Sequence, residues 1–98
     1  MKGFLFLEMI TVYVLQSLTD NATYVGMALN ALTRLKEHNA NKNRYTKAHT
    51  PWIIIYTEQF PDWASARVRE KYLKSTAGKK FLKKYFDHDG GTTGSLPA

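Results

Sequence analysis

The sequence predicts an α+β domain in which a small sheet is covered by helices, in the order β-β-α-β-α-α. Two short runs of β-branched and aromatic residues, at 10–16 and 22–26, flank a turn and indicate a hairpin. The apolar run "WIIIYTE" at 52–58 indicates a third strand, and helical periodicity occurs on both sides of it. With 98 residues, the chain is expected to form one domain with one modest core.

The predicted hairpin carries one tyrosine in each strand. Asp20-Asn21 tolerates the backbone of a tight turn, and as a two-residue turn it would place Tyr13 opposite Ala28. Tyr13 and Tyr24 then share one face of the sheet, where Gly26 leaves room for a backbone or a ligand. On the hairpin alone, a packing role for the tyrosines is favoured over a functional one. The opposite face is expected to meet the core through Val12, Val14 and Val25.

A helix is expected over 28–39, with an apolar stripe of Leu29, Leu32 and Leu35. Arg34 and His38 lie one turn apart, where they serve either a phosphate and proton transfer or only a solvated face. A polar loop follows at 40–51. Its candidates for DNA binding are three basic residues and an aromatic one, Lys42, Arg44, Tyr45 and Lys47.

The strand at 52–58 has no polar alternation, which predicts burial on both of its faces. A helix should begin at Pro61 and Asp62, with Asp62 as its cap, and run to about Lys74. A last helix is expected over 77–86, with an apolar face formed by Phe81, Leu82 and Tyr85. The tail at 87–98 is rich in Gly, Thr and Ser, and is expected to be disordered.

Glu70 is the one carboxylate that falls on an apolar helix stripe, alongside Trp63, Ala66 and Leu73. A glutamate there needs a partner. One interpretation is an ion pair with Lys74 or a neighbouring arginine. The other is a metal ligand, with Mg²⁺ favoured because it takes few carboxylates together with water and phosphate oxygens. The position of Glu70 alone does not separate the two.

The net charge of +6 favours a polyanionic partner, nucleic acid before membrane. Eight basic residues surround the single acid Glu70 between positions 67 and 84, which gives a local charge of +7. They are Arg67, Arg69, Lys71, Lys74, Lys79, Lys80, Lys83 and Lys84. The absence of cysteine excludes thiolate metal sites and cysteine nucleophiles. The apolar run at 3–15 is too short to span a bilayer, no signal peptide is expected, and a cytoplasmic location fits.

Five blocks in order resemble the GIY-YIG nuclease family. "VYV" at 12–14 and "YVG" at 24–26 are similar to the two halves of its signature, and "RLKEHN", "YTKAHTPW" and "ARVREKYLK" continue the likeness. The resemblance covers 10–86 and is closest to small single-domain bacterial members grouped with the nuclease domain of the excision-repair protein UvrC. It divides the chain into an N-terminal extension at 1–9, a nuclease domain at 10–86 and the tail at 87–98.

This resemblance implies a three-stranded antiparallel sheet flanked by helices, and a metal-dependent DNA endonuclease acting in DNA repair or recombination. Glu70 would hold one divalent metal, Mg²⁺ or alternatively Mn²⁺. Tyr13 would be the general base or would orient the attacking water, with Tyr24 positioning it or a phosphate oxygen. Because tyrosine has a pKa of about 10, a base role calls for a nearby cation to lower it. Arg34 would stabilise charge on the phosphate, and His38 and Tyr45 would contact water or phosphate.

The resemblance also implies DNA binding by backbone or structure rather than by sequence, through both loop and helix residues; the helix candidates are Arg67, Lys74, Lys79 and Lys80. A monomer or weak dimer is expected, without a membrane. The family pattern is broken in places: Val-Tyr-Val stands for Gly-Ile-Tyr, and Asn41 replaces a glycine but tolerates the same positive φ. The family's asparagine after the glutamate helix has no counterpart. A non-catalytic nucleic-acid-binding module, or a protein-interaction domain, remains the alternative.

Overall fold

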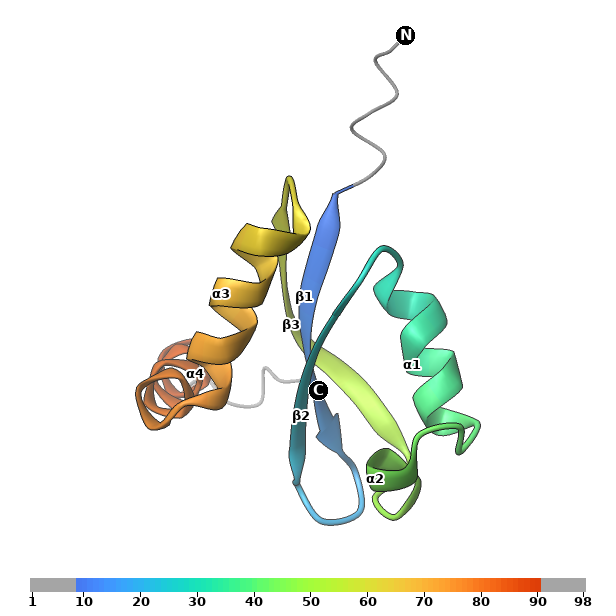
Figure 1. Ribbon diagram of the computed structural model, residues 1–98. Coiled ribbons are helices and arrows are strands. Elements are labelled where there is room, and N and C mark those ends of the chain that lie inside the picture. The colour runs from blue at the N-terminus through green and yellow to red at the C-terminus, as the bar shows by residue number, and fades with distance from the viewer. Residues whose placement is uncertain (1–8, 91–98) are drawn as a thin grey trace, which may run out of the picture.

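The computed structural model describes residues 9–90, without the side chains of 87–90 (Figure 1). A three-stranded antiparallel sheet of order β2-β1-β3 is flanked by helices, so the predicted fold class and element order are confirmed. One element was not expected, the four-residue helix α2 inside the polar loop. The elements are β1 (Ile10–Ser17), β2 (Thr23–Ala28), α1 (Ala31–Asn39), α2 (Arg44–Lys47), β3 (Trp52–Phe60), α3 (Trp63–Lys74) and α4 (Thr76–Gly90).

The strand buried on both faces is β1, and the prediction that this would be the third strand is wrong. β1 lies between β2 and β3, so helices cover both of its sides, whereas β3 is an edge strand whose Ile53 is 39% exposed. An apolar run records that a strand is buried somewhere, but pairing decides which strand lies in the middle. Val12 and Val14 pack with Val25 under α3 and α4, as predicted. Tyr13 and Leu15 form a second core under α1 and α2, which the sequence analysis did not anticipate.

The hairpin has a different register from the one predicted. Tyr13 is opposite Gly26 rather than Ala28, because residues 18–22 form a longer connection. The backbone N–H of Ser17 donates to the carbonyl of Ala22 at 2.8 Å, and Asn21 adopts the expected positive φ of 63°. A shift of two residues leaves every side chain on its original face, since side chains alternate with a period of two. The two tyrosines therefore do share a face.

Helix α1 begins three residues later than predicted. β2 continues to Ala28, and the side chain of Asn30 caps the helix by accepting from the backbone N–H of Thr33 at 3.0 Å. The predicted stripe is consequently wrong for Leu29 and Leu32, which are 58% and 66% exposed. The positions that pack toward the sheet recur at helical spacing from the cap; they are Ala31, Leu35 and His38.

Helices α3 and α4 cover the other side of the sheet from α1 and α2 (Figure 1). Asp62 caps α3 as predicted, accepting from the backbone N–H of Ser65 at 2.8 Å. Ala66 and Leu73 are fully buried, but Trp63, expected on the same stripe, is half-exposed. Helix α4 reaches Gly90, which includes four residues that the sequence analysis assigned to the tail. The rest of that tail and residues 1–8 of the N-terminal extension lie outside the described residues.

Asn41, which replaces the family's glycine, has a φ of 65°. The prediction that asparagine preserves this turn is confirmed, because its short polar side chain tolerates the left-handed region. The turn ends α1 and lets the chain enter α2, where Asn43 accepts from the backbone N–H of Thr46 at 3.1 Å. Helix α2 is thereby held close to the C-terminal end of α1, beside His38.

Candidate active site

Tyr13 lies at the centre of the site and is 1% exposed. Its hydroxyl oxygen is 3.1 Å from Nε2 of His38, which reaches down from α1. The ring of Tyr24, from β2, lies next to both, with centroids 6.4 Å from Tyr13 and 4.8 Å from His38. Gly26 is what makes this arrangement possible. A Cβ at Gly26 would lie 2.5 Å from the Tyr13 hydroxyl oxygen, so the room predicted for a ligand is occupied by Tyr13 itself.

Thr46 holds the other side of the His38 ring. Its hydroxyl oxygen is 2.9 Å from Nδ1 of His38, and the residue is fully buried. The Thr46 hydroxyl donates to the carbonyl of Asn43 at 3.4 Å, which leaves its lone pairs to accept a proton from His38 Nδ1. On this assignment, made from the hydrogen-bond network, Nε2 of His38 carries no proton and accepts from the Tyr13 hydroxyl.

Thr46 was missed by the sequence analysis. A threonine in a polar loop carries no distinguishing pattern, and the one local signal is the spacing Asn43-x-x-Thr46 of a short capped helix. Its placement depends on a distant residue, since the indole Nε1 of Trp52 donates to the Thr46 carbonyl at 2.8 Å. Trp52 is itself anchored to α1, where Asn39 accepts from its backbone N–H at 2.6 Å.

The protonation states of Tyr13 and His38 follow from their burial. Burial, and secondly the neighbouring Tyr24, raise the pKa of Tyr13 to about 12. Arg34 lowers the pKa of Tyr13 but does not outweigh these effects, so the expectation that a cation would make Tyr13 a ready base is wrong in this structure. Burial, followed by the charge of Arg34, lowers the pKa of His38. At neutral pH the pair is a neutral donor and a neutral acceptor.

Arg34 lies on α1 and interacts with the Tyr13 hydroxyl, which is why it affects the pKa of Tyr13. Its Nε is buried and makes no hydrogen bond within the described structure, although it lies 3.3 Å from Oε1 of Glu37. Its side chain is nevertheless 43% exposed. A guanidinium that is anchored at one end and open at the other suits a phosphate oxygen.

Glu70 lies on α3, on the other side of the sheet from His38. Its side chain is 13% exposed, with Oε1 3.3 Å from Nε of Arg67 and Oε2 3.0 Å from Nζ of Lys74. The ion-pair interpretation therefore describes its contacts. No group of three metal-binding His, Asp or Glu side chains occurs among the described residues, so any metal here would rest on this one carboxylate. That donor fits Mg²⁺ completed by water and phosphate oxygens, but Arg67 and Lys74 hold the same oxygens.

Tyr24 connects the two sides of the site. Strand β2 is an edge strand that runs between α1 and α3 (Figure 1). The Tyr24 ring faces His38 and stacks on Tyr45 at 6.2 Å between centroids, and the same residue lines a pocket of about 210 Å³ with Lys74. Tyr13, Tyr24, Arg34 and His38 are thus brought together, whereas Glu70 reaches them only through Lys74 and the pocket.

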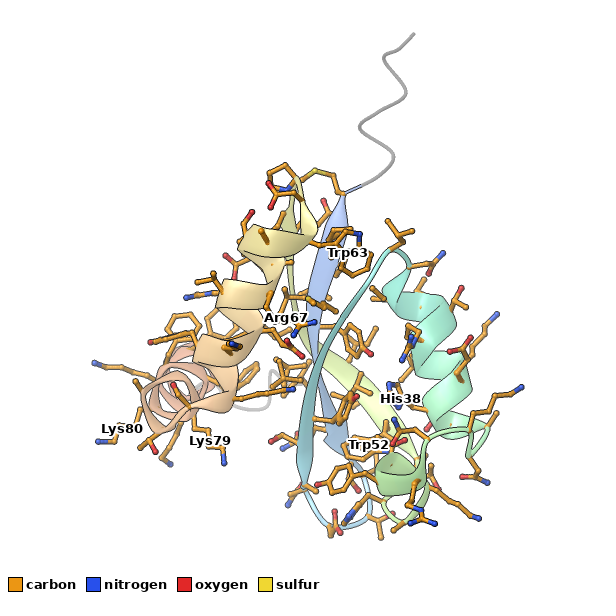
Figure 2. All side chains as sticks on the ribbon, in the orientation of Figure 1. His38, Trp52, Trp63, Arg67, Lys79 and Lys80 are labelled. Atoms are coloured by element: carbon orange, nitrogen blue, oxygen red, sulfur yellow. The ribbon has the colours of Figure 1, made fainter. Side chains whose placement is uncertain are left out.

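The predicted DNA-binding residues divide into two groups. Lys42, Arg44, Tyr45 and Lys47 are exposed on and before α2; Arg67, Lys74, Lys79 and Lys80 are exposed on α3 and α4 (Figure 2). Arg69, counted in the same basic run, has a structural role, because its Nε is 2.9 Å from Oε1 of Glu58 and its guanidinium lies over the Tyr72 and Phe81 rings. None of the helices between residues 9 and 90 is long and apolar enough to cross a bilayer.

Comparison with known proteins identifies one matching family. The profile of the GIY-YIG catalytic domain matches residues 9–85. The chain is 35% identical to a UPF0213 protein of Staphylococcus haemolyticus over 65 residues, 65% of this chain and 79% of that protein. It is 35% identical to a UPF0213 protein of Natronomonas pharaonis over 80 residues, 81% of this chain and 93% of that protein. A UPF0213 protein of Pediococcus pentosaceus is 38% identical over 76 residues, 74% and 79% of the two chains. No solved structure matches the chain.

Proposed function

Because the chain belongs to the GIY-YIG catalytic-domain family, we propose that it is a divalent-metal-dependent endonuclease that hydrolyses phosphodiester bonds of DNA. The family supports the reaction class, and the resemblance to UvrC favours a role in repair or recombination in the cytoplasm. The observation that carries the proposal is the buried hydrogen-bond chain from Tyr13 through His38 to Thr46, placed directly beside Tyr24 and Arg34.

The hydrogen-bond chain provides a path for the proton of the attacking water. Tyr13 donates to Nε2 of His38, so its own oxygen can accept the water proton while its hydroxyl proton moves to the imidazole. The proton then rests on His38, and no free tyrosinate has to form. This path avoids the cost set by a Tyr13 pKa of about 12. A neutral His38 is the state that such a transfer requires, and the lowered pKa of His38 supplies it.

Tyr24 and Arg34 are proposed to bind the phosphate. Tyr24 is more exposed than Tyr13, so its hydroxyl can reach a phosphate oxygen while Tyr13 faces the water. The open end of the Arg34 guanidinium stabilises the charge that grows on the phosphate during attack. Tyr45, stacked on Tyr24, extends this contact surface toward the basic residues of α2.

Glu70 is proposed to hold the metal, with Mg²⁺ first and Mn²⁺ as the alternative. When bound, a divalent ion would polarise the scissile phosphate and stabilise the leaving oxygen. Lys74 and Arg67 keep the Glu70 carboxylate ionised and oriented, and they neutralise it in the absence of metal. We propose that substrate phosphates draw these two cations away from Glu70, which frees its oxygens.

One observation favours a second function, non-catalytic binding of nucleic acid. The Glu70 carboxylate already has two cationic partners and thus needs no metal to be satisfied. The proposed monomer or weak dimer would then bind DNA through its basic surface, without cleavage.

The test is nicking of supercoiled plasmid and of single-stranded DNA with Mg²⁺ or Mn²⁺, comparing the wild type with Glu70→Ala and Tyr13→Phe. The nuclease proposal expects cleavage by the wild type, and loss of cleavage with retained DNA binding in both variants. A wild type that binds DNA without cutting it, or cleavage that survives Glu70→Ala, would replace the nuclease with the binding module.

A further inference from the structure

The corner between α3 and α4 is unusually close. Ser75 separates the helices, and its hydroxyl donates to the Tyr72 carbonyl at 2.5 Å and accepts from the backbone N–H of Gly78 at 3.1 Å. A Cβ on Gly78 would lie 1.9 Å from the Tyr72 carbonyl oxygen and 2.5 Å from Cα of Leu73. Only glycine fits there, so the first turn of α4 packs directly on the last turn of α3. This contact brings Lys74, the last residue of α3, close to Lys79.

The two lysines line the pocket that Tyr24 also borders. Its floor is apolar and buried, formed by Val25, Leu73 and Leu82, and Thr23 completes its polar rim. The volume of about 210 Å³ is several times the share of one water molecule, roughly 30 Å³, so a phosphate group fits with some of its hydration. Among the basic residues of α4, Lys79 alone lines this pocket.

The charges around this pocket lack a nearby anion. Nζ of Lys74 pairs with Glu70 at 3.0 Å, but Lys79 has no ion pair within residues 9–90. The first turn of α4 contains no acidic residue, although the positive end of a helix dipole disfavours a lysine there. A bound anion would offset both effects. A dianionic or monoanionic phosphate oxygen is the group that lysine, as a point charge, binds well.

We propose that this corner pocket is a binding site for one phosphate group of a nucleic-acid strand, held by Lys79 with Lys74 beside it. The inference deepens the proposed function and rests on it for the identity of the ligand. A strand that crosses the β2 edge would place one phosphate against Tyr24 and Arg34 and a neighbouring one in the pocket. The phosphate contact with Lys74 is also the contact that would release Glu70.

The test compares Lys79→Gln with Lys84→Gln, which removes the same charge from an exposed position on α4 outside the pocket. Binding of a short fluorescent single-stranded oligodeoxynucleotide is measured by anisotropy in EDTA at several salt concentrations. Lys79→Gln is expected to weaken binding about tenfold, as for loss of one charge-assisted hydrogen bond. The slope of log affinity against log salt should become shallower by about 0.7. Lys84→Gln should change affinity less than twofold.

A second arm identifies the ligand group. Oligonucleotides with one neutral methylphosphonate at each position in turn are bound to the wild type and to Lys79→Gln. One position should weaken wild-type binding and leave the binding of Lys79→Gln unchanged. Equal effects of the two lysine variants, or a penalty that persists in Lys79→Gln, overturns the proposal. So does the result that inorganic phosphate perturbs the Thr23 and Tyr24 NMR signals while DNA affinity is independent of Lys79, since the pocket then binds only adventitious anions.

This measurement needs neither metal nor cleavage. A wild type that never nicks DNA but binds it through Lys79 would refute the nuclease and leave the phosphate site standing. Metal-dependent nicking with Lys79-independent binding would do the reverse. Far-UV circular dichroism and thermal unfolding of both variants confirm that the helix corner is intact.

Discussion

Replacing Thr46 with valine should release the His38 ring from its fixed orientation. Valine has nearly the shape of threonine, but it removes the hydroxyl oxygen that lies 2.9 Å from His38 Nδ1. His38 is 1% exposed, so water does not easily take over this bond. The ring must then either keep a buried Nδ1–H without an acceptor, or move its proton to Nε2. In the second case Nε2 can no longer accept from Tyr13.

The size of the effect follows from burial. An unsatisfied buried donor costs about 1–3 kcal/mol, and the weak bond from Thr46 to the Asn43 carbonyl, at 3.4 Å, adds little. We expect Thr46→Val to lower the free energy of unfolding by about 1–3 kcal/mol. Thr46→Ser retains the hydroxyl and loses one methyl group, which in a core typically costs about 1 kcal/mol. The serine variant should keep the wild-type tautomer of His38.

The assay has two readouts. Urea unfolding gives the change in stability, and the ¹⁵N chemical shifts of the His38 ring report which nitrogen carries the proton. The wild type and Thr46→Ser should show a proton on Nδ1, whereas Thr46→Val should show a mixture or the Nε2 form. Nicking activity should fall with the Nδ1 population. If Thr46→Val retains a pure Nδ1 tautomer, or if the wild type carries its proton on Nε2, the proposed direction of proton transfer is refuted.

Three further predictions concern other parts of the site. Gly26→Ala should destabilise the protein by about 1–3 kcal/mol, because the new methyl meets the Tyr13 hydroxyl at 2.5 Å; an unchanged melting temperature would contradict this packing. Stability should fall as the pH drops below about 6.5, because the unfolded chain binds a proton that buried His38 resists; His38→Gln should flatten this dependence in urea titrations at pH 7.5 and 5.5. Glu70→Gln should abolish metal-dependent nicking yet tighten metal-free DNA binding, as it removes the only acid of the basic run; anisotropy that shows weaker binding would argue against that surface as the DNA contact.

The features that the sequence determined by itself are local or periodic. Asp62 caps α3, and Asn41 adopts a positive φ, because each depends on a side chain and its own adjacent backbone. Tyr13 and Tyr24 share a face although the predicted register was wrong by two residues, since strand alternation is unaffected by a shift of two. The order of strands and helices was predictable for the same reason, from changes of period along the chain.

The site itself was predictable only in part. The residues Tyr13, Tyr24, Arg34 and His38 were named from a resemblance, and the structure brings them together on one side of the sheet. Thr46 was missed, and the stripe of Leu29 and Leu32 was wrong, because the phase of a helix depends on where its cap and its packing partner lie.

Tertiary structure alone decided which strand is central, which carboxylate has which partners, and in what protonation state the tyrosine rests. Each of these depends on residues distant in the chain that meet only after folding. The raised pKa of Tyr13 is the clearest case, because it comes first from burial beneath α1 and then from Tyr24, and Arg34 does not reverse it. Burial is a property of the assembled molecule, so no local pattern could supply it.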